Sequence, residues 1–442
     1  MTYSIKDILR FEVAPALGCT EPSAVALCAA AAASLLKEKD GLQSLEILVD
    51  PNIFKNGMAV AIPGCNGLCG IDMAALLGAI GGDPYRKLEV LEPVSGEHIR
   101  KAEVLRNRRA VSVEVRPATG KLYIRARIRT SNEEAEAVIE NLHDRITFLK
   151  LDGSLLPDHK LLCIGSESSA NPEKIEEWLR TLTLEGLVSL LQELDEEDEA
   201  FLMEGVRFNT RLAEHGLAFA SGMGVGAAFE RLVCEGLLKK DMVLAARILT
   251  SGASDARMGG VKLPAMSSAG SGNHGLTAIL PIWAVKSFIE VEDGDRVMKA
   301  IALSHLVTAY IKAHTGRLSA LCGCSVAAGA GATAGITYLM GGSVRHMASA
   351  IKNLVSDLAG VICDGAKAAC SLKLATAAGT AVQSALFSLH GVGVQPTDGI
   401  IALTPEGTMK NIGTISTEGM IEMDRTVLKI MLEKQFDGYV HG

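Results

Sequence analysis

Residues 318–344 read LSALCGCSVAAGAGATAGITYLMGGSV, an uncharged run composed mostly of Gly, Ala, Ser and Thr. Two further runs without charge, residues 263–285 and 374–397, are similarly rich in small and hydroxylated residues. Each run is long enough to span a bilayer, but such residues favour membrane insertion much less than Leu, Ile or Phe. We therefore expect buried helices and loops of a soluble core, in which backbones approach one another closely.

The composition around these runs is that of a folded globular protein. Of the 442 residues, 48% are hydrophobic and 21% charged, whereas aromatic residues make up only 4% and glycines number 45. The net charge is −8 and no long basic run is present, so nucleic acid is not an expected partner. We likewise expect no membrane partner.

The first residues, MTYSIKDILRFEV, carry charges and lack the apolar run and cleavage site of a secretory signal. We therefore expect a cytoplasmic protein. Its ten cysteines are then not expected to form a disulfide framework. Metal binding, catalysis and simple burial remain open as their roles.

Helical patterns occupy both ends of the chain. Residues 5–12 form an amphipathic pattern, and Pro22 suits the first turn of a helix that continues through the Ala-rich residues 23–36. Beyond Asn171, a helix opens at Pro172 and residues 184–194 are amphipathic. The acidic run at residues 193–199 is expected to be a solvated face and linker. Residues 204–433 are expected to form helices broken by Gly-rich turns.

The intervening region has the character of strands. Short apolar or alternating segments lie at residues 45–49, 58–62, 110–115, 122–129, 135–142 and 145–151, with turns at 118–120 and 152–153 and a helix at 72–79. We predict an α+β fold class: a large, mainly helical, Gly/Ala-rich domain with an inserted smaller α+β subdomain that has a mixed or antiparallel sheet. The helical domain would comprise residues 1–43 and 165–442, and the subdomain residues 44–164.

Several cysteines lie in settings that suit a metal site. Cys322 and Cys324 precede a run of small residues, and Cys363 and Cys370 follow later. Thiolates are soft ligands for iron–sulfur clusters, zinc or copper(I), and a cluster held by three cysteines leaves one iron open as a Lewis acid. Spacing alone does not decide between a metal site and burial. Burial is the expectation for Cys28, Cys163 and Cys234, whereas the roles of Cys65 and Cys69 stay open.

Five motifs together resemble a known family. They are EVAPALGCTEP at residues 12–22, NIFKNGM at 52–58, GSGNHG at 270–275, Gly323-Cys324, and Cys363-Asp364-Gly365 through Cys370. Over nearly its whole length the chain resembles the L-cysteine desulfidases, relatives of the α-chain of iron–sulfur L-serine dehydratases. The Ser-Ser-His-Thr type segment of the dehydratases is not found, and Gly-Cys-Thr-Glu-Pro stands instead, which favours the desulfidase branch.

The resemblance implies a [4Fe–4S] cluster and no pyridoxal phosphate. Its metal ligands fall on Cys324, Cys363 and Cys370, with Cys322 as an ambiguous neighbour. Cys19 matches the early cysteine of the family, which caps the fourth iron at rest or acts near the substrate. The implied reaction converts L-cysteine to pyruvate, ammonia and sulfide.

Other residues are candidates for binding and catalysis. In residues 267–275, backbone N–H groups at Ser271 and Gly272 can form an anion nest for the substrate carboxylate. Asn273 can donate a hydrogen bond, and His274 can act as base or orienter. Lys55, Asn56 and Thr20 are candidates for substrate polar groups, and Glu21 for the ammonium. An ordinary Gly-rich turn, a structural histidine and solvated loops are the competing interpretations.

Three other functions compete with a desulfidase. They are an L-serine or L-threonine dehydratase with the same cluster, a small-residue-rich membrane transporter, and a non-catalytic iron–sulfur protein. The Cys19 segment and the loop at 270–275 argue against the last, because a purely structural cluster needs neither. The expected partner is a small amino-acid substrate, and the Gly/Ala-rich helices permit a homodimer.

Overall fold

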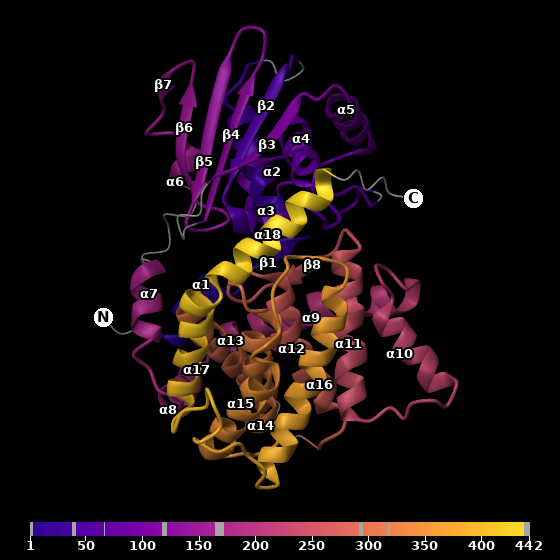
Figure 1. Cartoon of the computed structure of the whole chain (residues 1–442), viewed down its shortest axis with the longest axis vertical. Coiled ribbons are helices and arrows are strands. Elements are labelled where there is room, and N and C mark those ends of the chain that lie inside the picture. The colour runs from indigo at the N-terminus through magenta and orange to yellow at the C-terminus, as the bar shows by residue number, and fades with distance from the viewer. Residues whose placement is uncertain are drawn as a thin grey trace.

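The structure, a computed structural model, describes residues 3–37, 41–65, 67–116, 122–163, 172–290, 295–316 and 319–436. An α/β lobe lies at one end of the molecule and a larger helical lobe at the other (Figure 1). This arrangement confirms the predicted α+β fold class with a mainly helical major part.

The α/β lobe is built on a six-stranded sheet. Its strands are β2 (Ser44–Val49), β3 (Val111–Val115), β4 (Tyr123–Arg129), β5 (Glu134–Glu140), β6 (Ile146–Leu151) and β7 (Ser154–Leu155), in the order β3-β2-β4-β5-β6-β7. Strands β2 and β3 run parallel and the other pairs antiparallel, so the sheet is mixed. Burial alternates along β2 and β4, which leaves one face of the sheet to pack against helices.

Helix α2 (Thr20–Ala33) is buried along its whole length and packs on this sheet and on α4 (Ile71–Gly81). The contact with α4 requires glycine, because a Cβ at Gly78 would lie 2.2 Å from the carbonyl oxygen of Ala26. The lobe also contains α3 (Pro51–Gly57), η1 (Pro84–Glu89), α5 (Gly96–Asn107) and α6 (Lys160–Cys163). Small side chains thus bring backbones together, as the composition predicts.

The helical lobe surrounds a second hydrophobic core. It comprises α1 (Ile5–Glu12), α7 (Pro172–Leu179), α8 (Leu184–Ser189), η2 (Leu190–Glu193), α9 (Glu196–Phe219), α10 (Val225–Cys234), α11 (Met242–Met258), α12 (Gly272–Lys286), α13 (Asp295–Thr315), η3 (Cys324–Ala328), α14 (Gly329–Leu339), α15 (Val344–Leu358), α16 (Cys370–Leu389), α17 (Pro405–Thr414) and η4 (Ile415–Gly419). The uncharged runs contribute α12, η3, α14 and α16, which are largely buried. In the described parts of the chain, no helix combines the length and apolarity that crossing a membrane requires.

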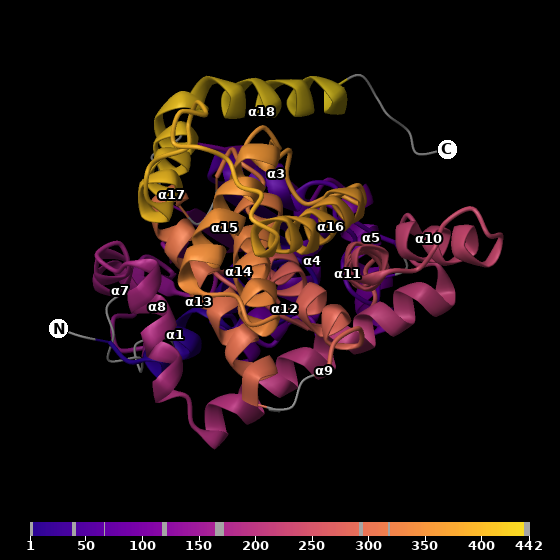
Figure 2. The same ribbon diagram turned by 90° about the horizontal axis from the view of Figure 1, so that it is seen from below.

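Among the contacts that join the lobes are a strand pair and a helix. Strand β1 (Pro15–Leu17), just before α2, pairs antiparallel with β8 (Pro264–Met266), just before α12. Helix α18 (Ile421–Phe436) crosses from the helical lobe toward the α/β lobe (Figure 1), and it runs along the outer edge of the molecule when seen from below (Figure 2). Its Leu428 and Leu432 pack against the core of the α/β lobe. Helix α1 packs in the helical core and α2 in the α/β core, and the division into domains at residues 44 and 164 stays a prediction.

Two predictions of local secondary structure were wrong, and so was the predicted burial of Cys234, which is exposed at the end of α10. Residues 58–62 form bends after α3, in which only Ala61 makes an isolated bridge to Cys69, because no neighbouring strand runs beside them. The acidic run 193–199 is not a linker, because Asp195 caps α9 and accepts a hydrogen bond from the N–H of Asp198 at 2.9 Å. The predicted turn at 118–120 lies outside the described residues.

Candidate active site

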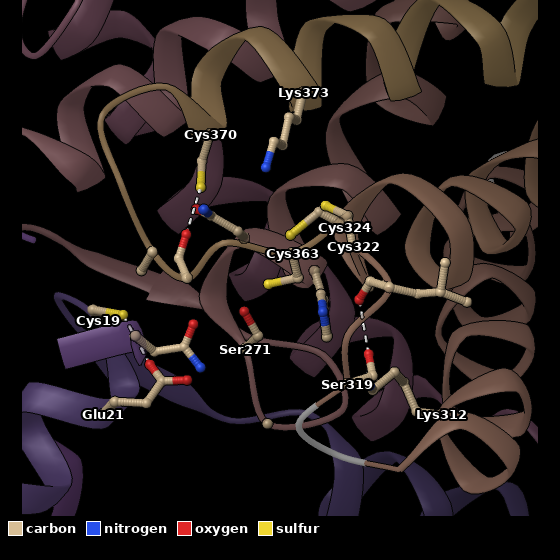
Figure 3. A pocket seen from close by; sticks show the side chains of 18 of the residues that line it. Cys19, Glu21, Ser271, Lys312, Ser319, Cys322, Cys324, Cys363, Cys370 and Lys373 are labelled. Carbon is tan, nitrogen blue, oxygen red and sulfur yellow. Dashed lines mark hydrogen bonds between the residues drawn. The ribbon is translucent and has the colours of Figure 1, made fainter. Parts of the chain in front are cut away.

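A pocket at the junction of the two lobes gathers most of the predicted site residues (Figure 3). The space between its walls is about 650 Å³, including its opening to solvent. Its lining consists of Cys19, Glu21, Asn56, Arg257, Gly270, Ser271, Asn273, His274, Lys312, Ser319, Leu321, Cys322, Gly323, Cys324, Cys363, Gly365, Ala366, Cys370 and Lys373. Segments more than 300 residues apart in the chain therefore meet here.

Four of the lining residues are cysteines of the helical lobe. Cys322 and Cys324 lie at the start of η3, Cys363 in the loop after α15, and Cys370 at the start of α16. A short backbone pairing brings the segments together, since Cys363 N donates to Ala320 O at 2.7 Å and Cys322 N to Val361 O at 2.9 Å. The labelled sulfurs surround one space in Figure 3.

The loop that carries Cys363 and Cys370 is fixed against α3. Gly365 adopts a φ of +91°, and a Cβ there would lie 2.1 Å from the carbonyl oxygen of Lys55. The ammonium of Lys367 donates to the same oxygen at 3.0 Å. The Sγ of Cys370 contacts Gly365 O at 3.7 Å. The position of these two cysteines thus depends on the α/β lobe.

The four thiols influence one another electrostatically. Burial raises the pKa of Cys363, and it raises the pKa of Cys370 to about 11. The hydrogen bond between Cys322 and Cys324 lowers the pKa of Cys322 and raises that of Cys324. A positive centre among these thiols would favour their thiolates.

The donor set suits an iron–sulfur cluster better than a single hard cation. Among the described residues, no group of three or more His, Cys, Asp and Glu side chains is placed to hold one metal ion. A cluster is larger than one ion, so its thiolate ligands stand further apart. The nearby carboxylate of Asp364 is paired with the Lys373 ammonium at 2.5 Å, which leaves sulfur as the main donor to the pocket.

The N-terminus of α12 forms another wall. Ser271 caps the helix without a side-chain hydrogen bond, so the first backbone N–H groups have no partner from that side chain. The turn before it is tight, with a φ of +45° at Ala269 and +78° at Gly270. This arrangement suits an anion such as a carboxylate.

Arg257 links this helix end to the segment before α2. Its buried guanidinium donates to Asn273 Oδ1 at 2.8 Å and to Gly18 O at 2.7 Å. A Cβ at Gly272 would lie 2.4 Å from its Nε, so the helix start and the guanidinium are packed tightly. Arg257 was not among the predicted site residues. No local signal marks it, because α11 also carries Arg247 and Asp255 among its small residues.

His274 is buried in the first turn of α12 and faces the thiol segment. Its Nδ1 lies 3.2 Å from Ser268 O, and a Cβ at Gly323 would lie 2.3 Å from its Nε2. Burial lowers the pKa of His274 to about 3, so the imidazole is neutral near pH 7. With the proton on Nδ1, donated to Ser268 O, Nε2 is left as an acceptor.

The α/β lobe contributes Cys19, Glu21 and Asn56 to the lining. The Cys19 thiol donates to Glu21 Oε2 at 2.9 Å, and the Thr20 hydroxyl donates to the same oxygen at 3.0 Å. Burial and the charge of Glu21 raise the pKa of Cys19 well above its usual value. Cys19 is therefore a neutral donor that orients the carboxylate.

Three predicted residues lie beside the pocket lining rather than in it. Thr20 contacts Glu21, and Gly272 packs on Arg257. The buried ammonium of Lys55 bonds Asp424 of α18 at 2.5 Å. The lining also includes Lys312, which donates to Ser319 Oγ at 3.3 Å and was not predicted because its helix shows no local sign of a site.

Comparison with known proteins places this pocket in a family. Residues 85–429 match the family described as serine dehydratase alpha chain. The chain belongs to the serine dehydratase alpha chain family. The four clustered thiols, Arg257 and the start of α12 all lie inside the matched range of this family, whereas Cys19, Glu21 and Asn56 precede it.

Relatives of this serine dehydratase alpha chain member extend over both lobes. A UPF0597 protein of Desulfatibacillum aliphaticivorans is 58% identical over 438 residues, 99% of each chain. A UPF0597 protein of Desulfotalea psychrophila is 56% identical over 441 residues, 99% of this chain and 100% of the relative. One of Clostridioides difficile is 45% identical over 425 residues, 96% of this chain and 98% of the relative.

Proposed function

We propose that the chain is a cytoplasmic iron–sulfur lyase that removes a β-substituent from a small amino acid, with L-cysteine as the substrate. One observation carries this proposal: four thiols share a pocket with the open N-terminus of a buried helix. The thiols suit a [4Fe–4S] cluster, and the helix end suits the substrate carboxylate. A reducing compartment would keep the thiols available.

Cys324, Cys363 and Cys370 would hold the cluster, and Cys322 lies close enough to exchange with Cys324. When bound, a cluster with three cysteine ligands supplies an open iron that acts as a Lewis acid on the β-leaving group. Gly323 leaves room for the His274 imidazole and Gly365 for the backbone of Lys55, because a Cβ at either position would collide with these groups. No pyridoxal phosphate is required.

The polar residues would hold the substrate and move its proton. The N–H groups of α12 and the amide of Asn273 face the carboxylate, and the carboxylate of Glu21 faces the ammonium. Neutral His274 offers Nε2 as the acceptor for the α-proton, and Arg257 fixes Asn273. Loss of the α-proton and of sulfide from L-cysteine gives aminoacrylate, which hydrolyses to pyruvate and ammonia.

The choice of L-cysteine over L-serine rests on the segment before the matched family range. Residues 12–22 supply Cys19 and Glu21, which complete the pocket from the α/β lobe. A buried neutral thiol beside the leaving group is a softer neighbour than a hydroxyl. An L-serine or L-threonine dehydratase is the second candidate, favoured by the description of the matched family.

A direct experiment compares products from three amino acids. Protein purified and reconstituted with iron and sulfide without oxygen should be brown and should release pyruvate and sulfide from L-cysteine. Pyruvate from L-serine or L-threonine at higher kcat/KM would replace the first proposal with the second. Colourless protein after reconstitution would refute the cluster.

A further inference from the structure

Glu21 also faces a histidine that does not belong to the described pocket lining. His143 lies in the turn between β5 and β6, and its Nε2 is 4.0 Å from Glu21 Oε1. Both side chains are buried, with exposed fractions of 7% and 9%. A residue of the β5–β6 turn thus approaches Glu21, which lines the pocket, without lining the pocket itself.

The two carboxylate oxygens of Glu21 have different surroundings. Oε2 accepts hydrogen bonds from Cys19 and Thr20, which belong to the same helix start. Oε1 faces His143, which comes from a different part of the lobe. Because 4.0 Å is too long for a hydrogen bond, the imidazole acts on Oε1 through electrostatics and packing, on the side that the neighbouring thiol and hydroxyl do not reach.

A second buried carboxylate lies near the same imidazole. Asp50 caps α3 by accepting from Asn52 N at 2.8 Å and Ile53 N at 3.2 Å, and it accepts from Tyr123 N at 2.8 Å. Burial raises the pKa of Asp50, and the charge of His143 opposes that rise. His143 therefore stands between one carboxylate that reaches the pocket and another that holds α3.

We propose that His143 is a positioning residue that orients the Glu21 carboxylate toward the ammonium of the amino-acid substrate. This inference rests on the proposed function of the pocket. Cys19 and Thr20 donate to Oε2, and a buried carboxylate oxygen without a nearby polar group is costly. His143 places a polar group beside Oε1, and it makes the β5–β6 turn part of the site without touching the substrate.

A double-mutant cycle tests the proposal. His143→Gln should lower kcat/KM for L-cysteine by about 10-fold, mostly through KM, because ammonium binding is weakened. Glu21→Gln should lower it further, and the double variant should be no worse than Glu21→Gln alone, because His143 acts through Glu21. Independent, multiplying losses would show a merely structural role and overturn the proposal.

Two further variants separate orientation from folding. His143→Leu removes the polar group that glutamine partly retains, so it should lose more kcat/KM than His143→Gln. His98→Gln is the matched control, because His98 lies in α5 of the same lobe, caps this helix by accepting from Ser95 N at 3.2 Å and does not line the pocket. His98→Gln should keep the KM of the unmodified chain, and circular dichroism should show every variant folded.

Calorimetric binding of L-alanine, which has no leaving group, separates this inference from the proposed function. His143→Gln could bind L-alanine more weakly while the unmodified chain releases no pyruvate from any amino acid. This result would support the positioning role of His143 and refute the lyase activity. Normal turnover and equal L-alanine binding in His143→Gln would refute His143 and leave the lyase intact. Neither binding nor turnover by the unmodified, cluster-loaded chain would refute both.

Discussion

The two walls of the pocket are built in different ways. We call the helical-lobe side the thiol wall, which comprises Cys322, Cys324, Cys363, Cys370 and the start of α12. The α/β-lobe side is the carboxylate wall, which comprises Cys19, Glu21 and Asn56. Backbone geometry and soft donors form the thiol wall, whereas oriented polar side chains form the carboxylate wall.

This difference coincides with the extent of the family match. The thiol wall lies within residues 85–429, and the carboxylate wall lies before them. This pattern is expected if members of the family share the chemistry of the thiol wall but differ in the residues that select the substrate. The comparison therefore predicts that damage to the thiol wall abolishes turnover, whereas damage to the carboxylate wall changes the substrate preference.

The largest effect is expected from the thiol wall. Cys363→Ala should remove the visible absorption and lower kcat/KM by about 1,000-fold or more, because a Lewis acid contributes several kcal/mol to the transition state. Absorption spectra and pyruvate release measure both. Cys28→Ala is the control, because Cys28 is buried in the α/β core with its thiol 3.3 Å from Ala137 O. Equal activity of the two variants would contradict the ligand assignment.

A smaller loss of activity is expected from substitution of Arg257, which joins the two walls. Arg257→Lys keeps the charge but cannot bond Asn273 and Gly18 together, so kcat/KM should fall by about 30- to 100-fold. The colour of the cluster should remain, which distinguishes this loss from loss of the thiol wall. Arg231→Lys, at an exposed position of α10, should leave kcat/KM unchanged. Loss of colour in Arg257→Lys would show that the walls are not separable.

Substitution of Gly365 tests how strongly the contact between the thiol wall and α3 stabilises the protein. Gly365→Ala places a Cβ 2.1 Å from Lys55 O at a φ of +91°, so unfolding free energy should fall by roughly 2–4 kcal/mol. Denaturant titration measures the change. Gly360→Ala in the preceding segment is the control, because a Cβ there meets nothing within 4 Å. Similar midpoints for both variants would contradict the tight contact.

The smallest effect is expected from α18. Asp424→Asn leaves the buried Lys55 ammonium without its carboxylate, so unfolding free energy should fall by roughly 1–3 kcal/mol while kcat at low temperature changes little. Thermal unfolding gives the stability and pyruvate release the rate. Glu433→Gln, which removes an exposed pair with Lys429 on the same helix, should change the Tm much less. An equal shift would show that the Lys55 pair does not stabilise the junction.

Much of the fold could be predicted because its signals are local. Alternation along residues 122–129 predicts β4, whose buried positions face the helices. The Ala-rich run from residue 23 predicts a buried helix, and α2 is one. The acidic run at 193–199 was misread, because charge alone does not distinguish a linker from a capped helix start. Asp195 and Glu197 in fact pair with Lys6 of α1.

Only the site residues that belong to recognisable sequence motifs could be predicted. Cysteines and a Gly-rich turn are visible as such, and Cys324, Cys363, Asn273 and His274 do line one pocket. Arg257 and His143 were missed, because their roles depend on partners more than 100 residues away, such as Gly18 and Glu21. Long-range pairing of this kind has no local signature in a single sequence.

The pair between Lys55 and Asp424 joins residues separated by 369 positions. A growing chain on the ribosome exposes α3 long before α18, and domains generally fold in the order of synthesis. The α/β lobe can thus form first, while the thiols at 322–370 emerge later. On the proposed function, we expect the cluster to be loaded after translation, when α18 has joined the two lobes and the completed pocket can shield the cluster from oxygen.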